Sequence, residues 1–286
     1  MAPLILAVQG SRVTDPHYKD LVPERNAKVP LVPQLLGNDA TDFVATAAVL
    51  ARMGYTEVNW NLGCPYPMVT NKRRGAGLLP HPGLIDAFLE HVCADSPIPI
   101  SVKLRLGLKD PREILDIIPI LNRYPLRRVI IHPRIGSQMY GGTVDLEGFA
   151  AASSLSIHEL VYNGDIADVA AFERLRSRFH RISGWMIGRA AVSNPFLPGL
   201  IKGGALPPDP AAPIKAFHDE LYFEYREALD GQRHVLDKMK ELWTYLGQSF
   251  PGAGETLKKL AKSTGFPGYE TAVRQVFSEC GYRRLD

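Results

Sequence analysis

The sequence predicts an α/β protein, a TIM-type (β/α) barrel that is followed by a small all-α helical domain. Short runs rich in Val, Ile and Leu recur up to Gly188, and helix-like segments separate them. The runs start at residues 4, 31, 57, 98, 128, 159 and 185, so successive starts are 26 to 41 residues apart. This regular spacing, without a break into two halves, favours a barrel of βα units over an open dinucleotide-binding sheet.

The apolar runs are the expected strands. Their hydrophobicity is nearly continuous rather than alternating, which is typical of strands buried on both faces of a parallel sheet. The runs are Leu4–Val8, Leu31–Leu36, Glu57–Asn61, Ile98–Leu104, Arg128–His132, Glu159–Asn163 and Trp185–Gly188. Seven runs are one fewer than the eight strands of a complete barrel.

Helices are expected between these strands. Residues 41–53 carry apolar side chains at intervals of three and four residues, which indicates a helix with one apolar face. Asp110 is an N-cap candidate for a second helix, with Pro111 at its first position and Glu113 placed for a capping box. The alternation of strand and helix indicates βα units.

A change of composition marks the expected domain boundary. Segment 203–213 is rich in Pro and Gly, and it predicts a linker between a barrel domain, 1–202, and a helical domain, 214–286. Helices are expected at 214–230, 232–249, 254–264 and 267–280. Basic and acidic residues balance in the helical domain, which fits either a plain docking domain or a basic face for a polyanion.

Composition narrows the class of protein. The 286 residues are 45% hydrophobic, which is too apolar for a disordered chain. No apolar stretch reaches the roughly 18 residues of a membrane span, and the first residues lack a secretory signal, so we expect a cytoplasmic protein. Cys64, Cys93 and Cys280 form no CxxC pair, which predicts a reducing compartment and no metal site. The formal net charge of +3 allows a nucleic-acid partner without demanding one.

Polar residues gather where the apolar runs end, which is where barrels place their active sites. Each of these residues alone has an ordinary explanation as a satisfied core group or a surface ion pair. Six strand ends out of seven with such residues are better explained by a ligand, because buried polar groups are costly without a partner. The residues are Gln34, Asn59, Asn61, Cys64, Lys103, Arg105, His132, Arg134, Asn163, Gly164, Asp165, Gly188 and Arg189.

The last two strand ends predict a phosphate site. Barrels often bind phosphate where the loops after their final strands meet the start of a helix. Asn163-Gly164-Asp165 lets backbone amides approach a ligand closely, and Gly188-Arg189 adds a fixed cation. Lys103 is suited to neutralise an anionic ring or enolate, and His132 could donate a hydrogen bond to the same ring.

The loop after the third run carries the clearest candidate for chemistry. Cys64 stands in Asn61-Leu-Gly-Cys-Pro-Tyr-Pro67, and a thiol at this place can act as a nucleophile or as a proton donor. Lys72, Arg73 and Arg74 follow it, which fits either a solvated loop or contact with a polyanion. Motifs of dinucleotide-binding, P-loop, zinc-protease and serine-hydrolase proteins are absent from the sequence.

With these motifs in order, the sequence resembles the tRNA-dihydrouridine synthases, flavin enzymes that reduce a uracil ring in tRNA. The most specific match is NxGCP followed by GAxLL, here Asn61–Pro65 and Gly75–Leu79. SVKLRLG, IHPRIG with a later Gln138 and Tyr140, YNGDI and MIGRAA match later family motifs in the same order. The resemblance runs from about Leu31 to Lys202, and more loosely over the helical domain.

The resemblance implies a role for each matched residue. Cys64 is the implied general acid, and the implied cofactors are FMN, with NADPH as reductant. The FMN ligands that it implies are Gln34, Lys103, His132, Asn163, Gly164, Asp165, Gly188 and Arg189. The implied contacts with the substrate tRNA are Asn61, Arg105, Arg134, Lys72, Arg73 and Arg74, with Lys238, Lys240, Lys258 and Lys259 as candidates on the helical domain. No membrane and no stable protein partner is implied.

The N-terminus departs from the family pattern. Members begin with a βα unit whose strand ends in Pro-Met, whereas residues 1–6 resemble the family's second strand and Gln9 to Lys28 the loop after it. We therefore expect the barrel to lack its first βα unit. Two other functions stay open: a small-molecule flavin reductase of the dihydropyrimidine or dihydroorotate dehydrogenase type, and a truncated, flavin-free barrel that only binds RNA.

Overall fold

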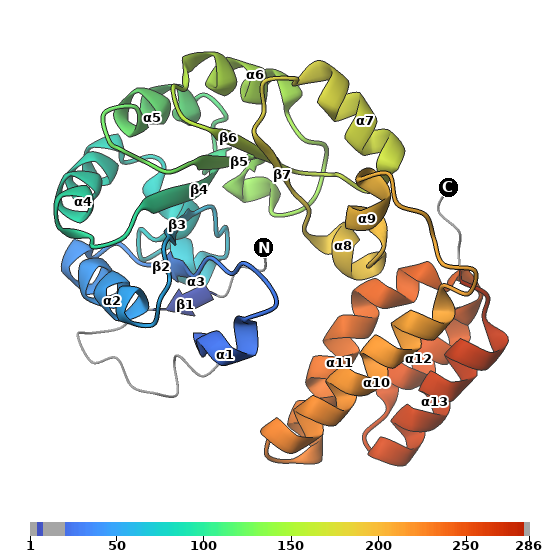
Figure 1. Ribbon diagram of the computed structural model, residues 1–286. Coiled ribbons are helices and arrows are strands. Elements are labelled where there is room, and N and C mark those ends of the chain that lie inside the picture. Colours follow the sequence, from blue (N-terminus) through green and yellow to red (C-terminus); the bar gives the residue numbers. More distant parts are fainter. Residues whose placement is uncertain (1–4, 8–20, 283–286) are drawn as a thin grey trace. The chain divides into compact units, whose positions relative to one another are not determined.

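The computed structural model describes residues 5–7 and 21–282 (Figure 1). Most of the expected loop Gln9 to Lys28 lies outside the described residues, which leave out 8–20. The chain divides into two compact units. Unit 1 comprises Met1–Gly164 and Phe179–Met186, and unit 2 comprises Asp165–Arg178 and Ile187–Asp286. Domain limits at 202 and 213 stay a prediction.

Unit 1 is built on a parallel sheet, and the prediction of an α/β barrel-type fold is confirmed. Within the described residues the sheet has seven strands in the order of the sequence, β1 to β7, which is the order of a (β/α) barrel. The strands are β1 Ile5–Ala7, β2 Gln34–Leu36, β3 Val58–Leu62, β4 Ile100–Gly107, β5 Val129–Ile135, β6 Leu160–Asn163 and β7 Gly184–Met186. Every expected apolar run overlaps one of them.

The register of the sheet brings the polar strand-end residues into rows. Gln34 of β2 pairs with Asn59 of β3, and Asn59 pairs with Ser101 of β4. Farther along, Asn61 pairs with Lys103, and Arg105 of β4 pairs with His132 of β5. Because all neighbours are parallel, the carboxyl ends of these strands meet at one edge of the sheet.

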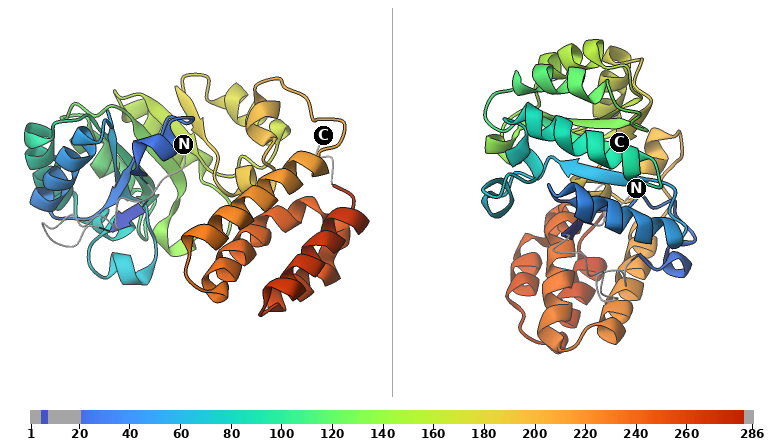
Figure 2. Two further views of the ribbon diagram at one scale, coloured as in Figure 1. Left: turned by 60° about the horizontal axis from the view of Figure 1, so that its bottom comes forward. Right: turned by 90° about the vertical axis from the view of Figure 1, so that its left-hand side faces the viewer.

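Helices of unit 1 follow the strands, as the views in Figures 1 and 2 show. The helix expected at 41–53 is α2, Ala40–Arg52, which begins where the Asp39 carboxylate accepts a hydrogen bond from the Asp42 amide. Its buried face meets α4, since Phe43 packs edge-on against Phe88. The other helical segments of the unit are α1 Pro23–Asn26, α3 Pro67–Thr70, η3 Gly75–Leu78, α4 Pro82–Asp95, α5 Glu113–Leu121, η4 Gly136–Gln138 and α6 Leu146–Leu155.

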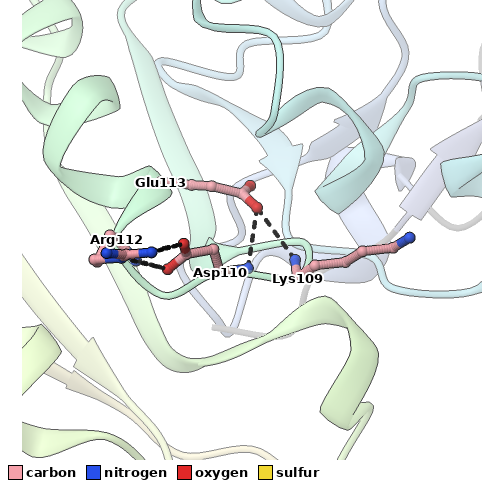
Figure 3. A network of polar contacts seen from close by, with 4 residues as sticks. All are labelled: Lys109, Asp110, Arg112 and Glu113. Carbon is pink, nitrogen blue, oxygen red and sulfur yellow. Dashed lines mark hydrogen bonds and ion pairs between the residues drawn. The ribbon is translucent and has the colours of Figure 1, made fainter.

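The start of α5 differs from the prediction. The helix begins at Glu113, and Asp110 with Pro111 forms the turn before it. The Glu113 carboxylate accepts backbone N–H groups from Leu108, Lys109 and Asp110, as Figure 3 shows for the last two. Asp110 accepts the N–H of Arg112 and pairs with its guanidinium. The expected capping glutamate therefore caps the preceding loop, and the helix starts two residues later than the predicted first position, Pro111.

Unit 2 consists of helices in the described residues. It contains α7 Val169–Arg178, α8 Arg189–Ser193, α9 Leu197–Ile201, α10 Ala211–Ala228, α11 Gln232–Leu246, η5 Gly247–Ser249, η6 Pro251–Ala253, α12 Gly254–Lys262 and α13 Phe266–Glu279. The last four α-helices correspond to the four expected ones. They enclose a core in which Met239, Trp243, Leu246, Tyr269 and Val276 are buried. No helix in the described part of the chain is long and apolar enough to cross a membrane.

Candidate active site

The Cys64 loop is held on both sides by its own motif residues. Asn61 turns its Oδ1 back to the loop, where it accepts the N–H groups of Gly63 and Cys64, each at 2.9 Å. The carbonyl of Cys64 accepts the N–H of Ala76 at 2.9 Å. The thiol is therefore presented from a short turn directly after β3, and the second half of the motif, Gly75–Leu79, lies against it.

Close packing explains the first glycine of that second half. Gly75 has a φ of 54°, a left-handed backbone conformation that favours glycine. A Cβ at this position would lie 2.7 Å from the Cys64 carbonyl oxygen and 2.8 Å from the Cys64 Cβ. The motif spacing thus reports a contact between two loops, which sequence matching alone did not reveal.

Below the loop lies a buried row of side-chain amides from neighbouring strands. Asn61 Nδ2 donates to Gln34 Oε1 at 2.8 Å, Gln34 Nε2 donates to Asn59 Oδ1 at 2.7 Å, and Asn59 Nδ2 donates to Ser101 Oγ at 2.9 Å. All four residues are buried. Gln34, Asn59 and Asn61 are predicted strand-end residues, whereas Ser101 joins the site without having been predicted. Its signal in the sequence is a hydroxyl on the strand that also carries Lys103 and Arg105.

Lys103 is a partly buried cation in the middle of β4. Burial, together with the nearby Arg105 guanidinium, lowers the pKa of Lys103 to about 8. Within the described residues its ammonium has no hydrogen-bond acceptor and no carboxylate partner. An ammonium that is partly removed from water is costly unless an anion or several acceptors meet it.

Arg105 joins the Cys64 loop to the loop after β5. Its Nε donates to the Gly63 carbonyl and its Nη1 to the Ile135 carbonyl, both at 2.9 Å. The guanidinium carbon lies 5.4 Å from the centre of the Tyr140 ring. Burial lowers the pKa of Arg105, whereas the neighbouring Tyr140 and Cys64 raise it. Arg105, Cys64 and Tyr140 therefore lie within electrostatic reach of one another.

His132 and Arg134 are both buried at the end of β5. Arg134 Nη1 faces His132 Nε2 at 3.2 Å, and a guanidinium can only donate, so Nε2 is the acceptor and the ring proton sits on Nδ1. The rest of the Arg134 guanidinium donates to the carbonyls of Gly141 and Gly142, at 3.1 and 2.8 Å. Arg134 thus shapes the loop that carries Tyr140.

The residues predicted for a phosphate site are divided between the two units. In unit 1, Asn163 Nδ2 donates to the Met186 carbonyl at 2.8 Å, and a Cβ on Gly164 would lie 3.2 Å from His132 Cδ2. In unit 2, the Arg189 guanidinium lies 3.9 Å from the Asp165 carboxylate, and Asp165 has a φ of 45°. Gly188 precedes α8 directly. That these groups bind one phosphate stays a prediction.

The three cations after Cys64 lie on the turn between α3 and η3. Arg74 Nε donates to Asn38 Oδ1, and Asn38 Nδ2 donates to the Lys72 carbonyl, each at 3.2 Å. Within the described residues the side chains of Lys72 and Arg73 have no carboxylate partner. Nearby on the same segment, Met68 is 77% exposed. The turn therefore presents cations and an apolar side chain to the solvent.

The candidate lysines of the helical domain are mostly engaged within it. Lys238 lies 3.8 Å from Glu241, and Lys258 lies 2.7 Å from Glu255. Lys240 donates to the carbonyl of Ser263, where α12 has ended. Across the described residues, no group of three or more His, Cys, Asp or Glu could hold a metal ion.

The family model and the similar sequences point to one family. The family model described as "Dihydrouridine synthase" matches residues 2–276. A tRNA-dihydrouridine(16) synthase of Cupriavidus necator is 29% identical over 260 residues, which cover 85% of this chain and 80% of that protein. The enzyme of the same name from Pseudomonas putida is 30% identical over 237 residues, or 79% of this chain and 72% of that protein. Among solved structures, morphinone reductase matches 60% of this chain and 50% of its own, with 19% identity and a TM-score of 0.45.

Proposed function

Because the chain belongs to the dihydrouridine synthase family, we propose that it is an oxidoreductase that reduces a uridine of tRNA to dihydrouridine. Two relatives that carry this activity in their names match at least 79% of the chain. The observation that carries the proposal is the Cys64 turn, which Asn61 holds in place and whose thiol lies within electrostatic reach of the Arg105 guanidinium. A proton donor, a cation and side-chain amides at one place suit the reduction of an electron-poor ring.

The residues present fit a flavin, and we propose FMN as the cofactor. Lys103 supplies a partly buried positive charge that an acceptor would stabilise. The pyrimidine edge of a flavin provides carbonyl oxygens and a nitrogen that becomes anionic on reduction. Within the described residues Gln34 retains one amide N–H without a partner. The chemistry that FMN supplies when bound, after reduction by NADPH, is hydride transfer to C6 of uracil.

The protein's own part in the reaction centres on a proton. Cys64 Sγ donates its proton to C5 of the ring, which leaves a thiolate that is later reprotonated from solvent. The Arg105 guanidinium attracts this thiolate, and it also holds the Gly63 carbonyl of the same turn. His132 would bind the cofactor ring through Nδ1–H, since Nε2 accepts from Arg134.

The remaining predicted ligands complete the proposal. Asn163, Gly164, Asp165, Gly188 and Arg189 would hold the FMN phosphate through backbone N–H groups and one guanidinium. For the tRNA, the target uridine must leave its stack to reach the flavin, where Asn61, Arg105 and Arg134 would meet it. Lys72, Arg73 and Arg74 would bind the phosphates around it.

The decisive experiment measures the product directly. The purified chain is incubated with an unmodified tRNA transcript, FMN and NADPH, and dihydrouridine is quantified by mass spectrometry of the digested RNA. We expect dihydrouridine from the wild type and a loss of at least about 100-fold in Cys64→Ala, which removes the acid. Cys93→Ala is the matched control, because this thiol lies in α4, away from the loop, and should leave turnover unchanged.

The same preparation separates the other two functions. Reduction of free uracil or orotate without tRNA, and no product in the transcript, would replace the proposal with a small-molecule flavin reductase. A colourless protein that takes up no FMN but shifts tRNA on a gel would replace it with an RNA-binding barrel. Near-normal turnover in Cys64→Ala would remove Cys64 from the role of acid.

A further inference from the structure

The buried amides under the Cys64 turn form one directional chain of hydrogen bonds. At its upper end, the N–H groups of Gly63 and Cys64 can only donate, so Asn61 must present its Oδ1 to them. Asn61 Nδ2 then faces Gln34, which must present its Oε1. The orientation of each amide is fixed by the next one along the chain.

The lower end of the chain lies inside the sheet. Gln34 Nε2 donates to Asn59 Oδ1, and Asn59 Nδ2 donates to Ser101 Oγ. Ser101 is fully buried and Asn59 is 4% exposed, so neither can exchange its partner for bulk water. Reversing the Gln34 amide would set two oxygens against each other at Asn59 and two nitrogens against each other at Asn61. The chain is therefore ordered as a whole or not at all.

We propose that Asn59 and Ser101 are positioning residues for Cys64, acting through the amides of Gln34 and Asn61. Neither residue touches the thiol or its turn. Asn59 provides the acceptor that keeps the Gln34 amide in one orientation, and Gln34 in turn keeps the Asn61 oxygen aimed at the Cys64 N–H. The role of Asn59 and Ser101 in this reaction rests on the proposed function. Their effect on the geometry of the Cys64 turn does not depend on that function.

The chemistry of the chain predicts which substitutions it tolerates. Asn59→Leu keeps much of the volume and removes both hydrogen bonds, so the Gln34 amide loses its acceptor. Asn59→Asp keeps an acceptor for Gln34, and the Ser101 hydroxyl can rotate to donate to the second carboxylate oxygen. Asparagine is therefore replaceable by aspartate and not by leucine, which a role in packing alone would not predict.

The matched control removes a buried hydroxyl that takes no part in this chain of hydrogen bonds. Thr46 on α2 is 1% exposed, and its hydroxyl donates to the Asp42 carbonyl at 2.8 Å. Thr46→Val should lower the melting temperature of the barrel unit without any effect on the Cys64 turn. A change that Asn59→Leu shares with Thr46→Val reflects a loss of stability. A further change that only Asn59→Leu shows reflects the broken chain of hydrogen bonds.

The first readout does not depend on turnover. Full-length protein without added flavin is treated with iodoacetamide, and the alkylation rate of Cys64 is measured by peptide mass spectrometry relative to Cys280 in the same molecules. We expect Asn59→Leu to speed alkylation of Cys64 about fivefold, the equivalent of one lost hydrogen bond, because the turn is released. Asn59→Asp and Thr46→Val should stay within about twofold of wild type.

The second readout is steady-state kinetics with tRNA. Asn59→Leu should lower kcat about tenfold and leave KM for tRNA unchanged, because the cations that bind the phosphates are untouched.

A folded Asn59→Leu with wild-type alkylation and kcat, or an Asn59→Asp as defective as Asn59→Leu, would overturn the proposal. If Asn59→Leu does not fold, Ser101→Ala decides in its place: faster alkylation of Cys64 supports the chain, and an unchanged rate overturns it. A wild type that makes no dihydrouridine defeats the proposed function alone, since alkylation still reports on the turn.

Discussion

At the scale of single residues, Lys103 is a side chain whose charged form a bound anion would stabilise. It lies partly buried on β4, and its pKa is lowered to about 8 by burial and by the positive charge of Arg105. An anion that binds beside it restores the charged form and raises this pKa again. Binding and protonation of Lys103 are therefore linked.

This linkage predicts that FMN affinity falls as the pH rises above about 8. Below that pH the ammonium is already charged in the flavin-free protein, whereas above it each bound FMN must recruit a proton. We expect the dissociation constant, followed by quenching of flavin fluorescence, to rise about tenfold between pH 7 and pH 9. Lys103→Met should bind more weakly at pH 7 and show little of this pH dependence. An affinity that is flat across this range in the wild type would contradict the assignment.

The strand-end residues show how far prediction from sequence reaches at this scale. That Gln34, Lys103 and His132 lie at one edge of a sheet was predictable, because parallel strands share their carboxyl ends. Their hydrogen-bond partners were not. Asn61 and Arg134 were expected to contact substrate, yet much of each side chain is engaged by carbonyls and N–H groups of neighbouring loops. Loop geometry decides such partners, and apolar periodicity does not encode it.

At the scale of elements, the start of α5 illustrates the same limit. Asp110, Pro111 and Glu113 correctly indicated a helix start, but the helix begins at Glu113 itself. The Glu113 carboxylate accepts the N–H groups of Leu108, Lys109 and Asp110, all of which precede the helix. Likewise α10 begins at Ala211, inside the expected linker, because Asp209 accepts the N–H groups of Ala211 and Ala212.

The network of Figure 3 predicts an unequal effect of two neighbouring substitutions. Glu113→Ala leaves the N–H groups of Leu108, Lys109 and Asp110 without their acceptor, and should lower the free energy of unfolding by about 1–3 kcal/mol. Arg112→Ala breaks only the ion pair with Asp110 on the surface, and should have no measurable effect. Urea denaturation of both variants tests this; equal losses would show that the two sites do not differ as described.

At the scale of the whole molecule, the chain divides into two compact units. The Pro- and Gly-rich segment 203–213 lies within unit 2, together with α8. Polar contacts join α8 to the helical bundle: Ser249 donates to the Ser193 carbonyl, and Tyr282 donates to Asn194. These contacts link residues 56 and 88 positions apart, and single side chains of this kind leave no signal in a sequence pattern.

Unit 2 contains a buried polar network of its own. Trp243 Nε1 can only donate, and it bonds to Tyr269 Oη at 3.0 Å. The phenol hydrogen then goes to His218 Nε2 at 2.7 Å, and His218 Nδ1–H to the Asp219 carboxylate at 2.9 Å. This order requires a neutral His218, whose pKa is lowered by burial despite the opposing pull of Asp219. Protonation of Nε2 would remove the acceptor of the Tyr269 hydroxyl.

The network predicts that unit 2 loses stability in mild acid before unit 1 does. A histidine with a lowered pKa in the folded state contributes its full stability above its unfolded pKa of about 6.5, and that stability falls as the pH drops below this value. Hydrogen exchange by mass spectrometry, corrected for the intrinsic effect of pH, should show protection in α10 and α13 falling by at most about tenfold per pH unit below about 6.5. Peptides of α4 in unit 1 serve as the internal control and should change little. In His218→Gln the fall in protection of α10 and α13 should disappear, because residue 218 then takes up no proton. A fall of the same size in this variant would assign the effect to other groups.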